Sequence, residues 1–367
     1  MKITRIAAYQ AGLPYVGGAY RWGRGEVIET ALTTVVTVET DAGLTGCGEC
    51  CPIGANYLAA YPEGVTAALV RLAPALLGRD PRALHAIERV MDRALKGHPY
   101  AKSALDAACW DLLGQSVGLP VHMLLGGKLT DGAPMYRVVP QKPRDEAVAE
   151  MEGYRRDGYR HFQIKVGNDW RGDIERIEAA AEIVQCDEQV YADANTGWTV
   201  GEAVRVVQAV RALGIMIEQP CETYEECLHV RARTDLPMKL DECVTGLPVA
   251  ERIVNDRAAE VVCLKISNLG GLTKARRVRD YLVAHGLSVV CEDTWGGEIT
   301  TAALSHLAAS TPEELLFNTT NLHAYNRVST GAPGPRTAEG RLYASDAPGL
   351  GVAPCFETLG DPVAVYS

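Results

Sequence analysis

The sequence lacks the features that identify membrane-spanning, secreted and zinc-stabilised proteins. It contains no run of roughly 18 or more apolar residues, so no transmembrane helix is predicted. The first residues, MKITRIAAYQ, do not show the basic and then apolar pattern of a signal peptide, and we expect a cytoplasmic protein. The eleven cysteines are scattered, and no second CxxC accompanies Cys47–Cys50 at zinc spacing, which is typical of small buried side chains in a reducing compartment.

An excess of positive charge is also missing. The chain has 36 Lys and Arg against 46 Asp and Glu, a net charge of −10. This charge would repel the phosphates of nucleic acids and anionic membrane surfaces, so we expect neither as a partner. With 367 residues, of which 47% are hydrophobic, the chain is long enough for about two domains or one large one.

The first 130 residues predict a separate α+β domain (1–130). β-Branched residues concentrate in two segments on either side of a Gly/Tyr/Trp loop, which is typical of antiparallel strands. Three stretches with apolar residues at helical spacing follow. The predicted strands are Ile3–Tyr9 and Val27–Thr40, and the predicted helices are Val65–Leu77, Leu84–Lys96 and Ala101–Val117.

From residue 131 to residue 341 the sequence repeats one unit, in which a short apolar run, a loop and an amphipathic helix follow one another. The apolar runs begin near Pro134, His161, Gln189, Ile215, Met238, Val261, Ser288 and Leu315. Eight such units, each about 25 residues long, predict an α/β fold whose parallel strands close into a (β/α)8 barrel. An open doubly wound sheet is the alternative, disfavoured because no GxGxxG follows the first run. We expect the Gly/Pro-rich tail 342–367 to return to the N-terminal domain.

Acidic residues end three consecutive runs of the predicted barrel. Asp193, Glu218 and Asp241 end the third, fourth and fifth runs, and neighbouring strands lie about 4.8 Å apart. Three adjacent carboxylates would repel one another without a cation between them, and their hard oxygen atoms suit Mg²⁺. We therefore predict a magnesium site. The alternative is that these carboxylates cap the following helices or pair with Lys239.

Lysines end the second and sixth runs. Lys165 and Lys265 would lie on opposite sides of a ring of eight strands, so their amines would approach a bound ligand from opposite faces. A desolvated lysine near a divalent cation can have its pKa lowered toward neutrality, as a general base requires. Proton abstraction next to a metal-bound carboxylate is the predicted reaction class, leading to epimerisation or to loss of a β-hydroxyl. Each lysine could instead be a salt-bridge partner of the carboxylates.

These residues resemble the ordered site of the enolase superfamily. The resemblance covers essentially the whole chain and rests on the following set: Lys165, Asp193-x-Asn195, Glu218, Asp241-Glu242 and Lys265. It implies a modified (β/α)8 barrel with an N-terminal α+β capping domain, Mg²⁺ as the cofactor and two catalytic lysines. The chain is similar to the muconate-lactonising-enzyme subgroup, which uses one lysine after the second strand and another after the sixth. The segment Ser288–Glu298 has no histidine of the mandelate-racemase kind. It departs from that subgroup at Gln163, where a second lysine is frequent.

The sequence after the seventh run points to an ammonium-bearing substrate. Asp293 and Trp295 in CEDTWGG offer a charge and an indole face, which together suit an ammonium group. The segment Asn318–Asn321 lacks the Asp-x-Asp of dipeptide epimerases, so a dipeptide substrate is disfavoured. Together with GECCPIG and KGHPYAK, the pattern resembles cis-3-hydroxy-L-proline dehydratases and the related proline-betaine and hydroxyproline-betaine 2-epimerases.

The resemblance implies Mg²⁺-dependent dehydration of cis-3-hydroxy-L-proline to Δ1-pyrroline-2-carboxylate, with 2-epimerisation of a betaine or a hydroxyproline as the alternative. In cis-3-hydroxy-L-proline the α-hydrogen and the hydroxyl lie on opposite ring faces, so elimination is anti and suits opposed lysines. We expect a small amino-acid or betaine substrate and a homo-oligomer. Two alternative functions from other classes are a Schiff-base aldolase and a non-catalytic barrel with a structural or interaction role. Further predicted substrate contacts are Tyr57 and Asn195, with Tyr20, Trp22, Cys50, Cys51, Ile53 and Tyr136 as weaker candidates.

Overall fold

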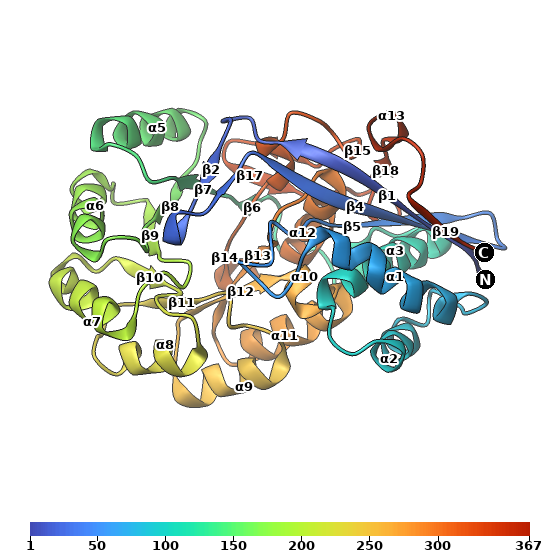
Figure 1. Ribbon diagram of the computed structural model, residues 1–367, viewed down its shortest axis with the longest axis horizontal. Coiled ribbons are helices and arrows are strands. Elements are labelled where there is room, and N and C mark those ends of the chain that lie inside the picture. Colours follow the sequence, from blue (N-terminus) through green and yellow to red (C-terminus); the bar gives the residue numbers. More distant parts are fainter.

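The computed structural model describes residues 1–367, apart from the side chain of Arg24. It consists of an N-terminal cap and a barrel, with the cap sheet reaching from the two chain ends to the barrel (Figure 1). The cap has an antiparallel sheet in the order β19-β1-β4-β5, covered by three helices. Its elements are β1 (Ile3–Pro14), β2 (Tyr20–Arg21), β3 (Val27–Ile28), β4 (Thr30–Thr40), β5 (Thr45–Cys50), α1 (Pro62–Leu76), α2 (Leu84–Ala94) and α3 (Pro99–Val117).

The strand β5 was not predicted from the sequence. Its sequence, TGCGEC, has two glycines and few β-branched residues, so it carries little strand signal. The glycines are there because α3 packs directly on this strand: a Cβ atom on Gly48 would overlap the carbonyl oxygen of Ala104. The predicted second strand also divides, since β3 pairs with β2 and the long strand β4 begins only at Thr30.

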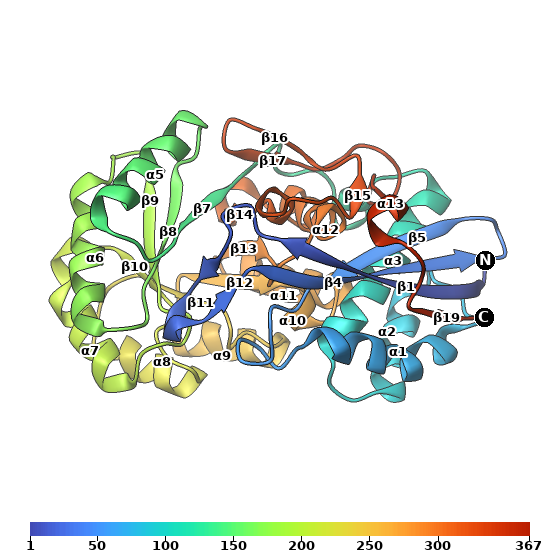
Figure 2. The same cartoon turned by 45° about the horizontal axis from the view of Figure 1, so that its top comes forward.

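The eight predicted apolar runs form eight parallel strands in chain order, and the doubly wound alternative is wrong. A bridge between Met135 and Thr319 brings the first and last strands together, so the sheet is a nearly closed barrel. Figure 2 shows α5 to α9 outside these strands. The strands are β7 (Tyr136–Val139), β8 (His161–Lys165), β9 (Gln189–Asp193), β10 (Met216–Glu218), β11 (Met238–Leu240), β12 (Val261–Lys265), β13 (Ser288–Glu292) and β14 (Leu316–Thr319).

Local signals in the sequence set the ends of several barrel helices. Thr199 and Thr223 each form a capping box with the glutamate three residues later, which starts α7 and α8. The helices are α4 (Val121–Leu124), α5 (Arg144–Arg156), α6 (Trp170–Ile183), α7 (Val200–Ala209), α8 (Tyr224–Arg231), α9 (Leu247–Asp256), α10 (Ile266–Leu269), α11 (Leu272–Ala284), α12 (Glu298–Ala309) and α13 (Phe356–Leu359). Among the residues that the structure describes, none of the helices is long and apolar enough to cross a membrane.

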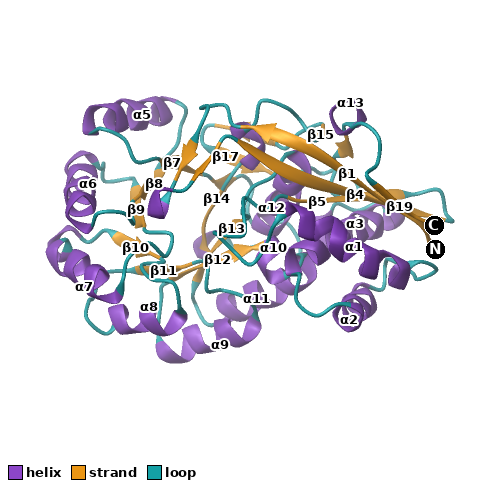
Figure 3. Cartoon of the chain, viewed as in Figure 1, coloured by secondary structure: helices purple, strands orange, loops and turns teal.

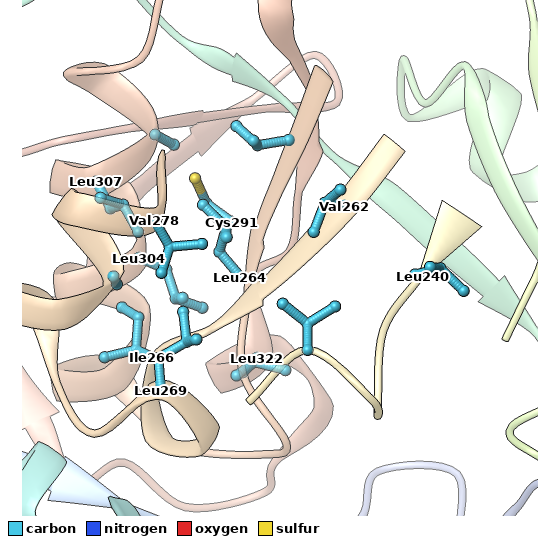
Figure 4. Close-up of a cluster of buried hydrophobic side chains, with 14 of the residues drawn as sticks. Leu240, Val262, Leu264, Ile266, Leu269, Val278, Cys291, Leu304, Leu307 and Leu322 are labelled. Atoms are coloured by element: carbon cyan, nitrogen blue, oxygen red, sulfur yellow. The ribbon is translucent and has the colours of Figure 1, made fainter. Parts of the chain in front are cut away.

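The strands divide their side chains between two environments. Val262 and Leu264 of β12 and Cys291 of β13 point outward and pack against helices α11 and α12, where they meet Val278 and Leu304 (Figure 4). The alternate positions of the same strands point into the barrel. A polar residue at an inward position near the end of a strand therefore faces the barrel mouth.

The last part of the chain leaves the barrel and ends on the cap. β17 (Arg341–Tyr343) pairs with β16 (Arg336–Ala338) and β6 (Ala133–Pro134), and β15 (Gly331–Ala332) pairs with β18 (Ala353–Pro354). β19 (Ala364–Tyr366) then adds an antiparallel edge to β1. Figure 3 shows β1 and β4 running toward the barrel from the side where the two termini and β19 lie.

Buried carboxylates join the cap to the barrel by capping helices across the interface. Glu49 of β5 accepts hydrogen bonds from the backbone N–H groups of Gly297 and Thr300 at the start of α12. Asp106 of α3 accepts bonds from the backbone N–H and hydroxyl of Thr273 at the start of α11, at 2.9 and 2.6 Å. These groups would otherwise be unpaired, so the two contacts hold the cap over the barrel mouth.

Candidate active site

A cavity of about 50 Å³ lies between the cap and the carboxyl ends of the barrel strands. Its walls bring together most of the residues that the sequence singled out. The predicted residues in its lining are Lys165, Asp193, Asn195, Asp241, Lys265, Asp293, Trp295 and Tyr57. Glu218 is fully buried and lies beside Asp193 in the sheet register, beneath this lining.

The three predicted metal-binding carboxylates occupy adjacent strands and are buried. Burial and the nearby charge of Asp193 raise the pKa of Glu218 to about 7, and burial also raises the pKa of Asp241. Within the described residues, Asp241 Oδ1 and Glu242 Oε2 have no hydrogen-bond partner. Buried, repelling carboxylates with unpaired oxygens are a donor set that fits a hard divalent cation such as Mg²⁺.

Two of the three predicted metal ligands, Glu218 and Asp241, lie in one compact group of possible ligand atoms, and Asp193 does not. Glu218 and Asp241 offer ligand atoms within 4.8 Å of one another together with Cys263 and Glu292. Asp193 lies outside this group, and its Oδ2 accepts a hydrogen bond from Lys165. The alternative partner considered for the carboxylates is also present: the Nζ of Lys239 is 2.9 Å from Glu218 Oε1.

The two lysines come from opposite sides of the barrel and are both paired with carboxylates. Lys165 Nζ lies 2.5 Å from Asp193 Oδ2 and 2.9 Å from Asn195 Oδ1. Lys265 Nζ donates to Asp241 and, at 2.8 Å, to Glu292 Oε1.

The carboxylates paired with the two lysines raise the pKa values of both amines. Burial by itself would lower the pKa of Lys165, but the charges around it, first that of Asp193, raise the pKa above its usual value. The pKa of Lys265 is raised in the same way by Asp241 and Glu292, against the effect of burial. The lowered pKa expected from the sequence concerns lysines beside a bound divalent cation, and it stays a prediction.

Glu292 is a site residue that the sequence reasoning missed. It ends β13, lines the cavity, and accepts a 2.7 Å hydrogen bond from the hydroxyl of Tyr136 in addition to its bond from Lys265. Although burial opposes ionisation, Lys265 and Lys239 lower its pKa to about 2. Strand alternation could have identified it, because Val290 and Glu292 share the inward face of β13.

Asp293 and Trp295 line the cavity but are also held by structural contacts. The carboxylate of Asp293 accepts bonds from the backbone N–H of Ser267 at 3.0 Å and from its hydroxyl. Burial raises the pKa of Asp293 to about 6. The indole N–H of Trp295 donates to Asn326 at 2.8 Å, and its ring lies 5.3 Å from the ring of Tyr20.

The remaining predicted contacts divide into two groups. Tyr57 places its ring 5.7 Å from Lys265 Nζ, and the Asn195 amide bridges Lys165 and Glu242. The weaker candidates that also line the cavity are Tyr20, Trp22, Ile53 and Tyr136. Cys50 and Cys51 are buried in apolar clusters and do not line the cavity.

Comparison with known proteins places this fold and site in one class. Residues 146–358 match the enolase C-terminal domain-like family. Residues 24–126 match the mandelate racemase/muconate lactonizing enzyme N-terminal domain. The chain belongs to the enolase superfamily and is an enzyme of that superfamily.

Particular relatives are similar over the full length. The chain is 48% identical over 367 residues, covering 100% of both proteins, to cis-3-hydroxy-L-proline dehydratase of Roseibium aggregatum. A crystal structure of a mandelate racemase/muconate lactonizing enzyme from Roseovarius nubinhibens is 57% identical with a TM-score of 0.97, covering 100% of this chain and 98% of that one. Another from that organism, complexed with magnesium, is 36% identical with a TM-score of 0.96 and full coverage of both chains.

Proposed function

We propose that this enzyme dehydrates cis-3-hydroxy-L-proline to Δ1-pyrroline-2-carboxylate with Mg²⁺ as its cofactor. The observation that carries the proposal is the pair of buried lysines, Lys165 and Lys265, which face one small cavity from opposite strands above a cluster of carboxylates. Its 48% identity to a cis-3-hydroxy-L-proline dehydratase supports the choice of substrate.

Asp193, Glu218 and Asp241 would hold the metal. When bound, Mg²⁺ would neutralise the negative charge that develops on the substrate carboxylate as the α-proton leaves. The unpaired Asp241 Oδ1 and the raised pKa of Glu218 support this site, because the first is a free acceptor atom and the second reflects burial and repulsion by the nearby Asp193.

The two lysines would supply the base and the acid of an anti elimination. One lysine, as the free amine, takes the α-proton, and the electron pair of the C–H bond forms the Cα–Cβ double bond. The opposite lysine, as the ammonium, protonates the 3-hydroxyl, which leaves as water. The resulting enamine tautomerises to the cyclic imine. Glu292, through its bond to Lys265, orients one of the two amines.

The rest of the cavity would bind the ring and its amine. Asp293 carries the negative charge, and the indole of Trp295 and the ring of Tyr57 provide aromatic faces for a ring ammonium. Asn195 keeps Lys165 in place through its amide oxygen. Because cap residues close the cavity, water is kept away from the reacting atoms.

Proton NMR in D₂O tests the proposal directly. The Mg²⁺-loaded enzyme is incubated with cis-3-hydroxy-L-proline and, in parallel, with proline betaine, and an EDTA-treated sample is the control. We expect the hydroxyproline signals to be replaced by those of Δ1-pyrroline-2-carboxylate, and only in the presence of metal. Deuterium entering the α-position of proline betaine, without elimination from the hydroxyproline, would assign a 2-epimerase instead.

A further inference from the structure

Lys239 is a fully buried cation inside the barrel that the proposed reaction does not use. It lies on the inward face of β11, two residues before Asp241, and its side chain has no exposed surface. Removing an ammonium group from water is unfavourable by several kcal/mol unless charged or polar partners replace the solvent. A lysine at this position therefore needs a specific partner.

The partner is Glu218. Lys239 Nζ lies 2.9 Å from Glu218 Oε1, and among the described residues this is the one ion pair that Glu218 makes. Lys265, a second lysine close to these carboxylates, is ion-paired with Asp241 and Glu292 and makes no ion pair with Glu218.

Aromatic rings and an amide complete the setting of this ion pair. The rings of Tyr191 and Tyr136 lie 4.5 and 5.5 Å from Lys239 Nζ, so their faces add a weaker attraction for the cation. The second oxygen of Glu218 accepts a 2.9 Å bond from the Gln163 amide. Oε1 is therefore ion-paired with Lys239, whose Nζ makes no hydrogen bond, and Oε2 is hydrogen-bonded. A carboxylate with about four acceptor positions still has room for a metal.

We infer that Lys239 is a positioning residue: it is an internal counter-cation that compensates the charge of Glu218 and holds this carboxylate in place before a divalent cation binds. The inference rests on the proposed Mg²⁺ site. Because the positive charge beside Glu218 belongs to the chain itself, we expect the barrel to fold without metal. Outer contacts of this kind orient metal-binding side chains in many proteins.

Thermal unfolding of the Lys239→Met variant, with EDTA and with saturating Mg²⁺, tests this role. Methionine is close to lysine in length and removes the charge. We expect a lower Tm in EDTA and a rise on adding Mg²⁺ that exceeds the wild-type rise by at least about 3 °C, because the metal supplies the missing charge. The control Met238→Ala, on the same strand, should lower Tm equally with and without metal. An equal Mg²⁺-dependent rise in Lys239→Met and wild type would overturn the inference.

A double variant tests the same pair without any metal. In EDTA, Lys239→Met and Glu218→Gln each leave one buried charge without its partner, so the double variant should have a higher Tm than either single variant. This also applies if Lys239→Met alone does not fold. A double variant less stable than both single variants would show that Lys239 only fills space. If wild-type Tm does not respond to Mg²⁺ while this coupling is present, the proposed metal site fails and the counter-ion pairing stands.

Discussion

Replacing Glu49 tests whether a helix cap across the domain interface holds the two parts together. The Glu49 carboxylate accepts hydrogen bonds from Thr33, from the backbone N–H of Gly297, and from both the N–H and the hydroxyl of Thr300, at 2.9 to 3.1 Å. In Glu49→Ala, two buried backbone N–H groups lose their acceptor. At about 1–3 kcal/mol for each such group, the free energy of unfolding should fall by about 2–6 kcal/mol.

Glu49→Gln should have a smaller effect. Its amide oxygen can still accept from Gly297 and Thr300 while its NH₂ group donates to Thr33, so the loss is the charge on the acceptor, about 1–2 kcal/mol. Urea unfolding at pH 7 measures both variants. The control Glu39→Gln removes an acidic side chain of β4 that pairs with Arg5 of β1, where both side chains are partly exposed and about 0–1 kcal/mol is expected.

The two Glu49 variants should also separate stability from substrate binding. Gly297 follows Trp295 by two residues, so loss of the cap displaces the loop that carries the indole. We expect Glu49→Ala to raise KM more than it lowers kcat, and Glu49→Gln to change neither by more than about 3-fold, which is less than 1 kcal/mol. A Glu49→Ala variant as stable as Glu39→Gln would refute the interdomain cap.

Four further predictions concern the site and the pH dependence. Lys165→Ala and Lys265→Ala should each lower kcat by at least about 100-fold in the NMR assay with the circular dichroism spectrum unchanged, and native-like turnover in either variant would exclude the two-lysine mechanism. Asp241→Asn should weaken Mg²⁺ binding by roughly 10-fold or more in calorimetry; unchanged affinity would remove Asp241 from the metal site. Glu292→Gln keeps an acceptor for Tyr136 but loses the charge beside Lys265, so kcat should fall by about 10–100-fold at an unchanged KM. Burial lowers the pKa of His306 to about 4 from its ordinary 6.5; the unfolded chain therefore gains the proton first as the pH falls. This histidine alone should lower the stability by about 3 kcal/mol between pH 6.5 and pH 4, and His306→Gln should remove that part of the decline in urea titrations.

The sequence by itself determined the order of the elements. Eight apolar runs at a regular interval, separated by amphipathic helices, leave few topologies other than a parallel barrel, and the strands observed begin within about two residues of the predicted runs. It also determined where Lys165, Asp193 and Lys265 lie, because strand alternation and the polarity of a parallel barrel place inward residues at strand ends in one mouth. β5 was not predicted because its glycines are required by close packing against α3, which follows it by some fifty residues in the chain.

The pKa values of the ionisable groups in the site were decided only by the tertiary structure. Whether a lysine has a raised or a lowered pKa depends on distances to carboxylates on other strands, and these put Lys165 beside Asp193 and Lys265 between Asp241 and Glu292. The ion-pair partner of Lys239 could not be predicted either, because a buried lysine can pair with any of several nearby carboxylates and the sequence order does not select one. Electrostatic energies inside a protein change steeply when two charges move by a few ångströms. The hydrophobic periodicity that predicts helices and strands does not depend on exact distances between atoms. The sequence therefore predicts where the site lies more securely than it predicts the protonation of the residues in it.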